Sequence, residues 1–269
     1  MTPTSNYKDT ISKIFNEMLG NHPELVEEAI NFRREELNEI VCAHFDNTVA
    51  YGPFKGLRIS NNPRWGRYDK ASMIMGIYER EILKELEILK DSNKVFIDVG
   101  AADGYYGIGA IYSNFFKHSY LFEASDAGQK LISENAKLNG IEDRVFIKGT
   151  AESDFYLSIN GDDAKNSVVL IDIEGAEFEI VNSLTFEFFK NSSIIIELHD
   201  WFYENANALK EKLISDGIST HRVREVRTNS RDLSTIPEVS SLSDTNRWLL
   251  CSEGRGRLMS WLIFDPLIR

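Results

Sequence analysis

The stretch KVFIDVGAADGYYGIGA, Lys94–Ala110, decides how the rest of the chain is interpreted. It begins with an apolar run that contains Asp98, and glycines and a second carboxylate, Asp103, follow directly. An apolar run followed by a glycine loop and a helical pattern is typical of the first strand and helix of a nucleotide-binding α/β domain. Because glycine lets a backbone approach a ligand closely, we expect a ligand to lie against this loop.

After this stretch, short runs of Val, Ile, Leu and Phe alternate with amphipathic segments, which predicts a mostly parallel sheet covered by helices on both faces. Strands are expected at 95–99, 118–124, 144–151, 167–175, 193–200, 221–227 and 247–254. Helices are expected at 105–116, 126–140 and 205–217. The apolar tail, residues 261–269, is expected to form an edge or a subunit contact.

The segment before residue 91 has a different pattern. Apolar residues at near-helical spacing predict helices over about 7–45 and over 71–90, separated by a loop rich in Gly, Pro and Asn at 51–70. We therefore expect residues 1–90 to form a helical extension on the substrate side, and residues 91–269 to form the α/β domain.

Charge and composition exclude several classes of function. The net charge of the 269-residue chain is -12, which disfavours a nucleic-acid substrate, including an RNA, because that affinity comes largely from Lys and Arg. Cys42 and Cys251 are far apart, so neither a disulfide framework nor a zinc site is expected. The polar N-terminus and the lack of an apolar run of roughly 18 residues predict a cytoplasmic protein without a membrane partner.

Acidic residues follow the first two predicted strands, where a parallel sheet binds its ligands. Glu123 ends the second strand, and an acid at that position typically binds the ribose of an adenosine cofactor. The loop after Asp98 is not G-x-G-x-x-G, and its carboxylates would repel the pyrophosphate of a nicotinamide cofactor. S-adenosylmethionine carries a sulfonium and an ammonium instead, so the charges favour it. A nicotinamide-dependent oxidoreductase is the weaker alternative.

Four segments together resemble the FkbM-type class I S-adenosylmethionine-dependent methyltransferases. They are FIDVGAADGYY (96–106), LFEAS (121–125), LIDIEGAEFEIV (170–181) and IIIELHD (194–200). The resemblance implies a Rossmann-like, seven-stranded sheet with its last strand antiparallel. It also implies O-methylation of a sugar, glycan or natural-product hydroxyl, as in polysaccharide or natural-product biosynthesis.

The resemblance further implies which residues bind the cofactor. Glu123 would bind the ribose and Glu152, after the third strand, would lie near the adenine. Glu79, on the helix that leads into the loop, matches a position that contacts cofactor or substrate. The loop would bind the methionine part and the neighbouring positions would complete the site: Asp98, Gly100, Ala101, Asp103, Gly104, Tyr105, Ala124 and Asp172.

The fourth and fifth strand ends carry the candidate catalytic groups. A hydroxyl usually needs a base or a metal to become a good nucleophile. Asp172 or His199 could be the base, and Glu174 could position the acceptor. A divalent metal held by Asp172 with His199 or Asp200 is conceivable but is not predicted, since magnesium prefers oxygen ligands. A regulatory protein that binds the cofactor without turnover is a further alternative.

Overall fold

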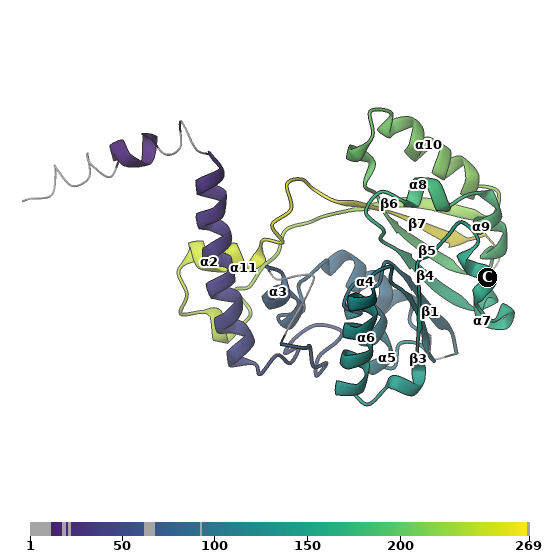
Figure 1. Ribbon diagram of the computed structural model, residues 1–269, viewed down its shortest axis with the longest axis horizontal. Helices are drawn as coiled ribbons and strands as arrows, with labels where there is room; N and C mark the ends of the chain where they lie inside the picture. Colours follow the sequence, from purple (N-terminus) through teal and green to yellow (C-terminus); the bar gives the residue numbers. More distant parts are fainter. Residues whose placement is uncertain (1–11, 18–19, 21–22, 62–67, 92, 268–269) are drawn as a thin grey trace, which may run out of the picture.

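The computed structural model describes residues 12–17, 20, 23–61, 68–91 and 93–267. A seven-stranded sheet with the order β3-β2-β1-β4-β5-β7-β6 forms its centre (Figure 1). β1 to β5 pair in parallel, and β7 is antiparallel to both of its neighbours. This confirms the predicted Rossmann-like fold. The strands are β1 (Val95–Val99), β2 (Ser119–Phe122), β3 (Val145–Lys148), β4 (Ser167–Ile171), β5 (Ser193–Glu197), β6 (His221–Arg227) and β7 (Ser260–Pro266).

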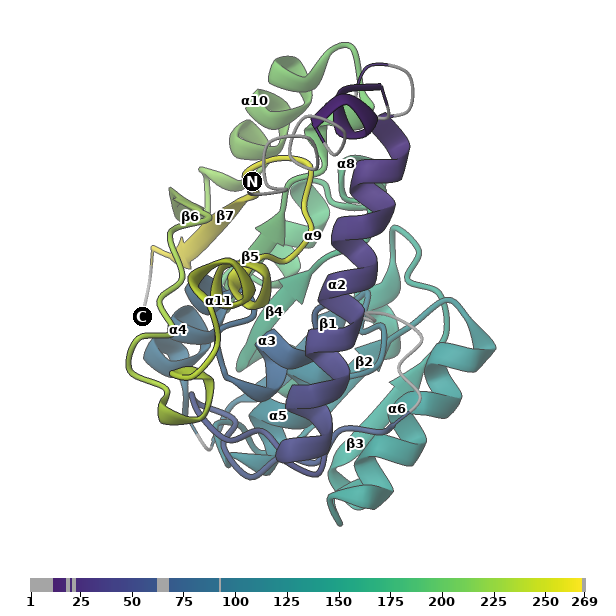
Figure 2. The ribbon, with the colours of Figure 1, turned by 90° about the vertical axis from the view of Figure 1, so that its left-hand side faces the viewer.

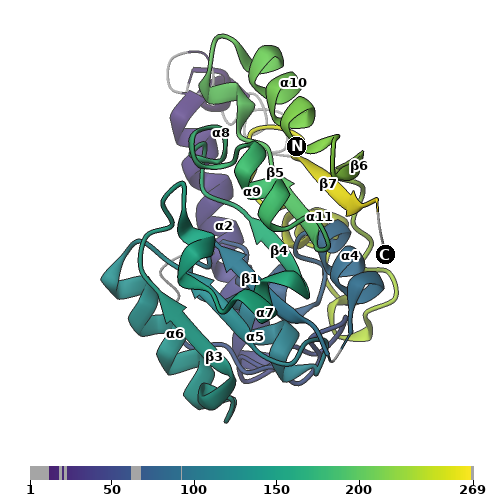
Figure 3. The ribbon, with the colours of Figure 1, turned by 90° about the vertical axis from the view of Figure 1, so that its right-hand side faces the viewer.

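Helices cover both faces of the sheet. α4, α5 and α6 lie on one face, and α7, α8, α9 and α10 lie on the other (Figures 1 and 3). The α-helices that follow residue 79 are α4 (Arg80–Leu89), α5 (Tyr105–Tyr112), α6 (Asp126–Leu138), α7 (Gly161–Lys165), α8 (Glu177–Ile180), α9 (Ser183–Phe188), α10 (Ala206–Gly217) and α11 (Asp244–Cys251). Because successive strand side chains point to opposite faces, Phe96 packs with the α5 side and Ile97 with the α9 side.

The N-terminal segment packs against the sheet domain. α2 (Pro23–His44) contacts α3 (Lys70–Ile74) and α11, and it runs in front of the sheet in Figure 2. Leu37 and Phe54 belong to the same hydrophobic cluster as Phe96 of β1 and Ile108 of α5. Residues on both sides of position 90 therefore share one core, and the division of roles between 1–90 and 91–269 stays a prediction.

Three sequence predictions are wrong in this structure. The helix expected over 71–90 is divided, because the backbone at Gly76 turns to positive φ and passes close to the carbonyl of Tyr51. The strand expected at 247–254 falls largely in helix α11, whose N-terminus is capped by Ser243. The apolar tail expected at an edge contains β7, which pairs with β5 and β6 and is largely buried. Parts of the predicted segments 7–45, 51–70 and 261–269 lie outside the described residues.

The ends of β1 and β4 meet at Gly100. Asp172 donates its backbone N–H to the carbonyl of Val99 at 2.8 Å. Gly100 has a φ of 93°, and a Cβ there would lie 1.7 Å from the carbonyl oxygen of Asp172. Only glycine allows this approach, which places the loop after β1 beside the residues that follow β4.

Replacing Gly100 by Ala should therefore destabilise the fold by at least about 3 kcal/mol, since both the backbone angle and the contact are lost. The matched control is Gly149→Ala, after β3, where a Cβ would have nothing within 4 Å. That control should change the free energy of unfolding by less than about 0.5 kcal/mol, measured by urea denaturation. If both substitutions changed the free energy of unfolding by equally small amounts, the close approach of Gly100 to the carbonyl of Asp172 would not constrain the fold.

Candidate active site

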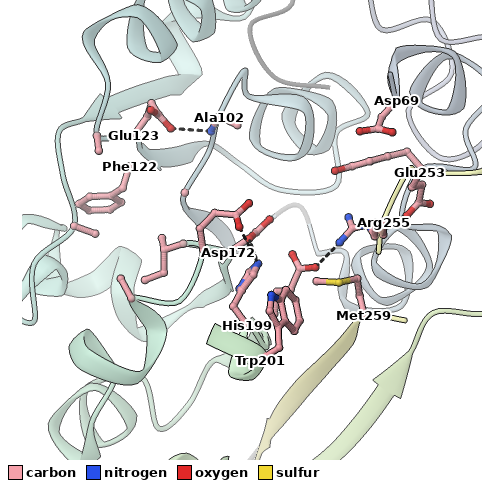
Figure 4. Close-up of a pocket in the computed structure, with 18 of the residues that line it drawn as sticks. Asp69, Ala102, Phe122, Glu123, Asp172, His199, Trp201, Glu253, Arg255 and Met259 are labelled. Carbon is pink, nitrogen blue, oxygen red and sulfur yellow. Dashed lines mark hydrogen bonds and ion pairs between the residues drawn. The ribbon is translucent and has the colours of Figure 1, made fainter. Parts of the chain in front are cut away.

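A cavity of about 730 Å³ lies at the carboxyl ends of β1, β2, β4 and β5. The strand ends supply its floor, and the segments around Asp69 and residues 253–259 close it from the other side (Figure 4). Tyr78 also lines the cavity. Carboxylates dominate its polar lining. They are Asp69, Glu123, Asp172, Glu174, Glu197 and Glu253, with Arg255, Arg257 and His199 as the basic residues.

Glu123 is held rigidly at the end of β2. One carboxylate oxygen accepts hydrogen bonds from the N–H and the hydroxyl of Ser125, at 2.8 and 2.7 Å. The other accepts the N–H of Ala102 at 3.0 Å (Figure 4). Because a carboxylate offers about four acceptor positions, about one remains for a ligand hydroxyl.

Asp98 and Asp103 do not line the cavity. Asp98 accepts the N–H of Gly107 at 3.0 Å, and Asp103 accepts the N–H of Tyr105 at 3.2 Å, so both hold the first turn of α5. Burial, reinforced by the charge of Asp172, raises the pKa of Asp98 to about 8. Burial raises the pKa of Asp103 to about 6. Their predicted role at the methionine part stays a prediction.

The other predicted cofactor residues divide into two groups. Gly100 and Ala124 line the cavity, as Glu123 and Asp172 do. The remaining five do not: Ala101, Gly104 and Tyr105 are in the loop and the start of α5, Glu79 is buried behind Arg255, and Glu152 is exposed. Ala151, directly before Glu152, does line the cavity, so the predicted adenine contact of Glu152 stays a prediction.

The three predicted catalytic residues come together. Nε2 of His199 lies 3.7 Å from Oδ1 of Asp172 and 3.4 Å from Oε2 of Glu174. On the other side of the ring, the fully buried carboxylate of Glu177 lies 3.3 Å from Nδ1 and accepts the backbone N–H of His199 at 2.7 Å. This holds the imidazole with Nε2 toward the two cavity carboxylates.

Electrostatics differ between the two candidate bases. Burial raises the pKa of Asp172 to about 6, although the neighbouring Glu197 and His199 counteract it. For His199, burial lowers the pKa, but the Glu177 hydrogen bond and the charge of Asp172 outweigh it, and the net shift is upward. The upward shift in the pKa of His199 reduces its neutral, proton-accepting form, which favours Asp172 as the base.

Arg255 binds the carboxylates opposite this cluster. Its guanidinium donates to Glu197 at 2.7 Å and to Glu253 at 3.1 Å, and it also donates to Glu79. Burial and the charge of Asp172 raise the pKa of Glu197 well above its usual range. Sequence patterns did not indicate Arg255 or Glu253, since both follow α11 in a segment without a motif. Glu177 lies within the quoted stretch 170–181, but nothing in the pattern showed that its side chain turns toward His199.

No family model matches the chain, and neither does any curated protein. Solved structures that resemble it include TrmK of M. capricolum in complex with S-adenosyl-homocysteine (14% identity, 68% of this chain and 67% of that one, TM-score 0.43). Others are TYW2 of M. jannaschii in complex with AdoMet (16%, 70% and 76%, 0.41) and precorrin-6y C5,15-methyltransferase of Geobacter metallireducens (12%, 72% and 90%, 0.45). At these identities and TM-scores, the function of this chain has to follow from its own residues. The FkbM resemblance likewise stays a prediction.

Among the described residues, none of the helices is both long and apolar enough to cross a lipid bilayer.

The buried state of Asp98 predicts a pH effect on stability. Its pKa is about 8 in the folded chain and 3.8 when unperturbed, so folding takes up a proton between these values and stability falls as the pH rises through them. Asp98→Asn removes this dependence. Relative to wild type, the free energy of unfolding of Asp98→Asn should therefore rise by about 1.4 kcal/mol per pH unit between about pH 5 and about pH 7, and less steeply near pH 8. Urea denaturation across this range measures the difference, and parallel pH profiles would contradict the burial argument.

Proposed function

We propose that the protein is an S-adenosylmethionine-dependent methyltransferase that methylates a hydroxyl oxygen of a small-molecule or glycan acceptor. The observation that carries the proposal is the position and charge of the cavity. It lies where the chain crosses from the β3-β2-β1 half of the sheet to the β4-β5 half, at the carboxyl ends of the strands. Open α/β sheets bind their ligands at this point.

The charge of the lining favours a cationic cofactor over a phosphate-containing one. Six carboxylates line the cavity, and of its two arginines Arg255 is already paired with three carboxylates. A pyrophosphate would meet these carboxylates at close range, at a cost of several kcal/mol in a partly dry site. A sulfonium and an ammonium would be attracted instead. The nicotinamide alternative is therefore disfavoured, and so is a phosphate-rich nucleic-acid acceptor.

The residues of β1 and β2 suit the two ends of this cofactor. Glu123 has an acceptor position left for a ribose hydroxyl, and Phe122, Ala124 and Ala151 form an apolar wall beside it for a base. Gly100 and Ala102 leave room for the methionine part close to the backbone. When bound, the cofactor supplies a methyl group on a positively charged sulfur.

Asp172 is the group that we assign to deprotonation. In methyl transfer, a lone pair of the acceptor oxygen forms the new bond to the methyl carbon, and the sulfur–carbon bond breaks with its electron pair going to sulfur. The hydroxyl proton must leave, and Oδ1 of Asp172 has no hydrogen-bond partner among the described residues. Asp172 accepts the proton, while Glu174, whose side chain is exposed, positions the acceptor. These proposed roles favour an enzyme over the alternative of a regulatory protein that binds the cofactor without turnover.

The cofactor assignment predicts that Glu123→Gln weakens binding of S-adenosylmethionine by about 10- to 100-fold, because a hydrogen bond to a charged group contributes about 1.5–3 kcal/mol. Isothermal titration calorimetry measures it. Unchanged affinity in Glu123→Gln would contradict the proposed contact between Glu123 and the ribose. If folded wild-type protein did not bind S-adenosylmethionine, the cofactor assignment would be wrong.

A second variant separates two predicted contacts. Glu152→Gln should weaken binding only if that exposed carboxylate reaches the adenine, so its effect compared with Glu123→Gln tests the sequence-based assignment. The exposed Glu179, which lies outside the cavity lining, gives the matched control Glu179→Gln, whose affinity should equal that of wild type.

A further inference from the structure

Three side chains on the cavity floor have the spacing of a metal site. Ligand atoms of Asp172, Glu174 and His199 all lie within 4.8 Å of one another. Two ligands that bind one ion at about 2.1 Å each are separated by about 3–4 Å. The distances from Nε2 of His199 to the two carboxylates, 3.7 and 3.4 Å, fall in this range. They are also too long for good hydrogen bonds, so direct hydrogen bonding does not account for the arrangement.

The imidazole is oriented as metal-binding histidines are. The His199 side chain is 3% exposed, and its Nε2 makes no hydrogen bond within the described part of the chain. Its Nδ1 faces the buried carboxylate of Glu177, which also accepts the N–H of Gly175 at 2.8 Å and is therefore fixed itself. A carboxylate behind the ring fixes the tautomer and makes the free nitrogen a stronger ligand.

Asp172 supplies an independent observation that favours a cation here. Its Oδ1 is buried and has no hydrogen-bond partner among the described residues. A buried oxygen without a donor is unfavourable, and it faces the same point as Nε2 of His199. We propose that Asp172, Glu174 and His199 bind a divalent cation on the cavity floor, with Glu177 positioning His199.

A neighbouring group of carboxylates is a poorer candidate. Glu79, Asp172 and Glu197 also lie close enough together to share an ion. However, the guanidinium of Arg255 already contacts Glu79 and Glu197, so a cation there would meet a positive charge. Asp172 belongs to both groups. Its neighbours in the other group, Glu174 and His199, have no arginine contact in the described structure.

The ligand set indicates the kind of ion. One imidazole nitrogen and two carboxylates suit Mn²⁺, Fe²⁺, Co²⁺ or Zn²⁺ better than Mg²⁺ or Ca²⁺, which prefer oxygen alone. Three protein ligands leave coordination positions open toward the cavity. The catalytic consequence rests on the proposed function: an acceptor hydroxyl bound to the ion would lose its proton more readily, and Asp172, a ligand through its buried Oδ1, would take that proton on its other carboxylate oxygen. The binding itself does not rest on it.

The test is Mn²⁺ binding to the full chain after removal of metals with a chelator, without cofactor or acceptor. Electron paramagnetic resonance of free Mn²⁺ should show one saturable site per chain, and Zn²⁺ should compete for it. Glu174→Gln should weaken Mn²⁺ binding at least tenfold, and Glu177→Gln about 10- to 100-fold through His199. Glu179→Gln removes an exposed carboxylate outside the cavity lining, so it is the matched control and should bind Mn²⁺ as wild type does.

Glu174→Gly separates loss of the ligand from loss of the fold. Glu174 has a φ of 52°, where glycine is more favourable than glutamate, and its side chain is 81% exposed. This variant should lose Mn²⁺ affinity while its thermal midpoint is equal to or higher than that of wild type. Absence of saturable Mn²⁺ and Zn²⁺ binding in wild type, or unchanged affinity in Glu174→Gly, would overturn the proposal. If the wild-type protein binds Mn²⁺ but not S-adenosylmethionine, the metal site is supported and the proposed methyltransferase function is wrong. If it binds S-adenosylmethionine but not Mn²⁺, the methyltransferase proposal stands and the metal site is wrong.

Discussion

The salt bridges of Arg255 are the interaction on which the arrangement of the cavity depends. One guanidinium holds Glu79 before α4, Glu197 at the end of β5, and Glu253 after α11. Glu79 and Glu197 are buried and Glu253 is partly buried, and a buried carboxylate is costly unless a cation or a hydrogen-bond donor compensates it. Arg255 thus joins the N-terminal segment and the C-terminal segment to the sheet edge, and these two segments are the ones that close the cavity.

With Arg255 engaged there, the floor of the cavity keeps an excess of negative charge. Asp172 lies at its centre, between Glu197 on one side and the pair His199 and Glu174 on the other. The pKa values of Asp172 and Glu197 are raised because burial disfavours the charged form of each carboxylate. A cation that enters the cavity relieves this. The proposed cofactor and the proposed metal ion both carry positive charge, and either would compensate the negative charge of these carboxylates.

The sequence predicted the sheet well because buried parallel strands are nearly continuous apolar runs. It also predicted that Glu123, Asp172, Glu174 and His199 share one edge, since strand ends in a parallel sheet meet there. It could not predict side-chain direction: Asp98 and Asp103 turn back to the N–H groups of α5. Nor could it predict partners distant in sequence, such as Arg255 for Glu79, because no local pattern records a tertiary ion pair. The helix expected over 71–90 failed for a similar reason, a backbone contact with Tyr51.

The most direct test of the account is a crystal structure of the chain with S-adenosylhomocysteine. A ribose hydroxyl should lie within hydrogen-bond distance of Glu123, and the methionine part should lie against Gly100 and Ala102. The sulfur should face Asp172, so that the methyl group of S-adenosylmethionine would point toward the acceptor side. A ligand bound elsewhere, or bound in this cavity without contact to Glu123, would contradict it.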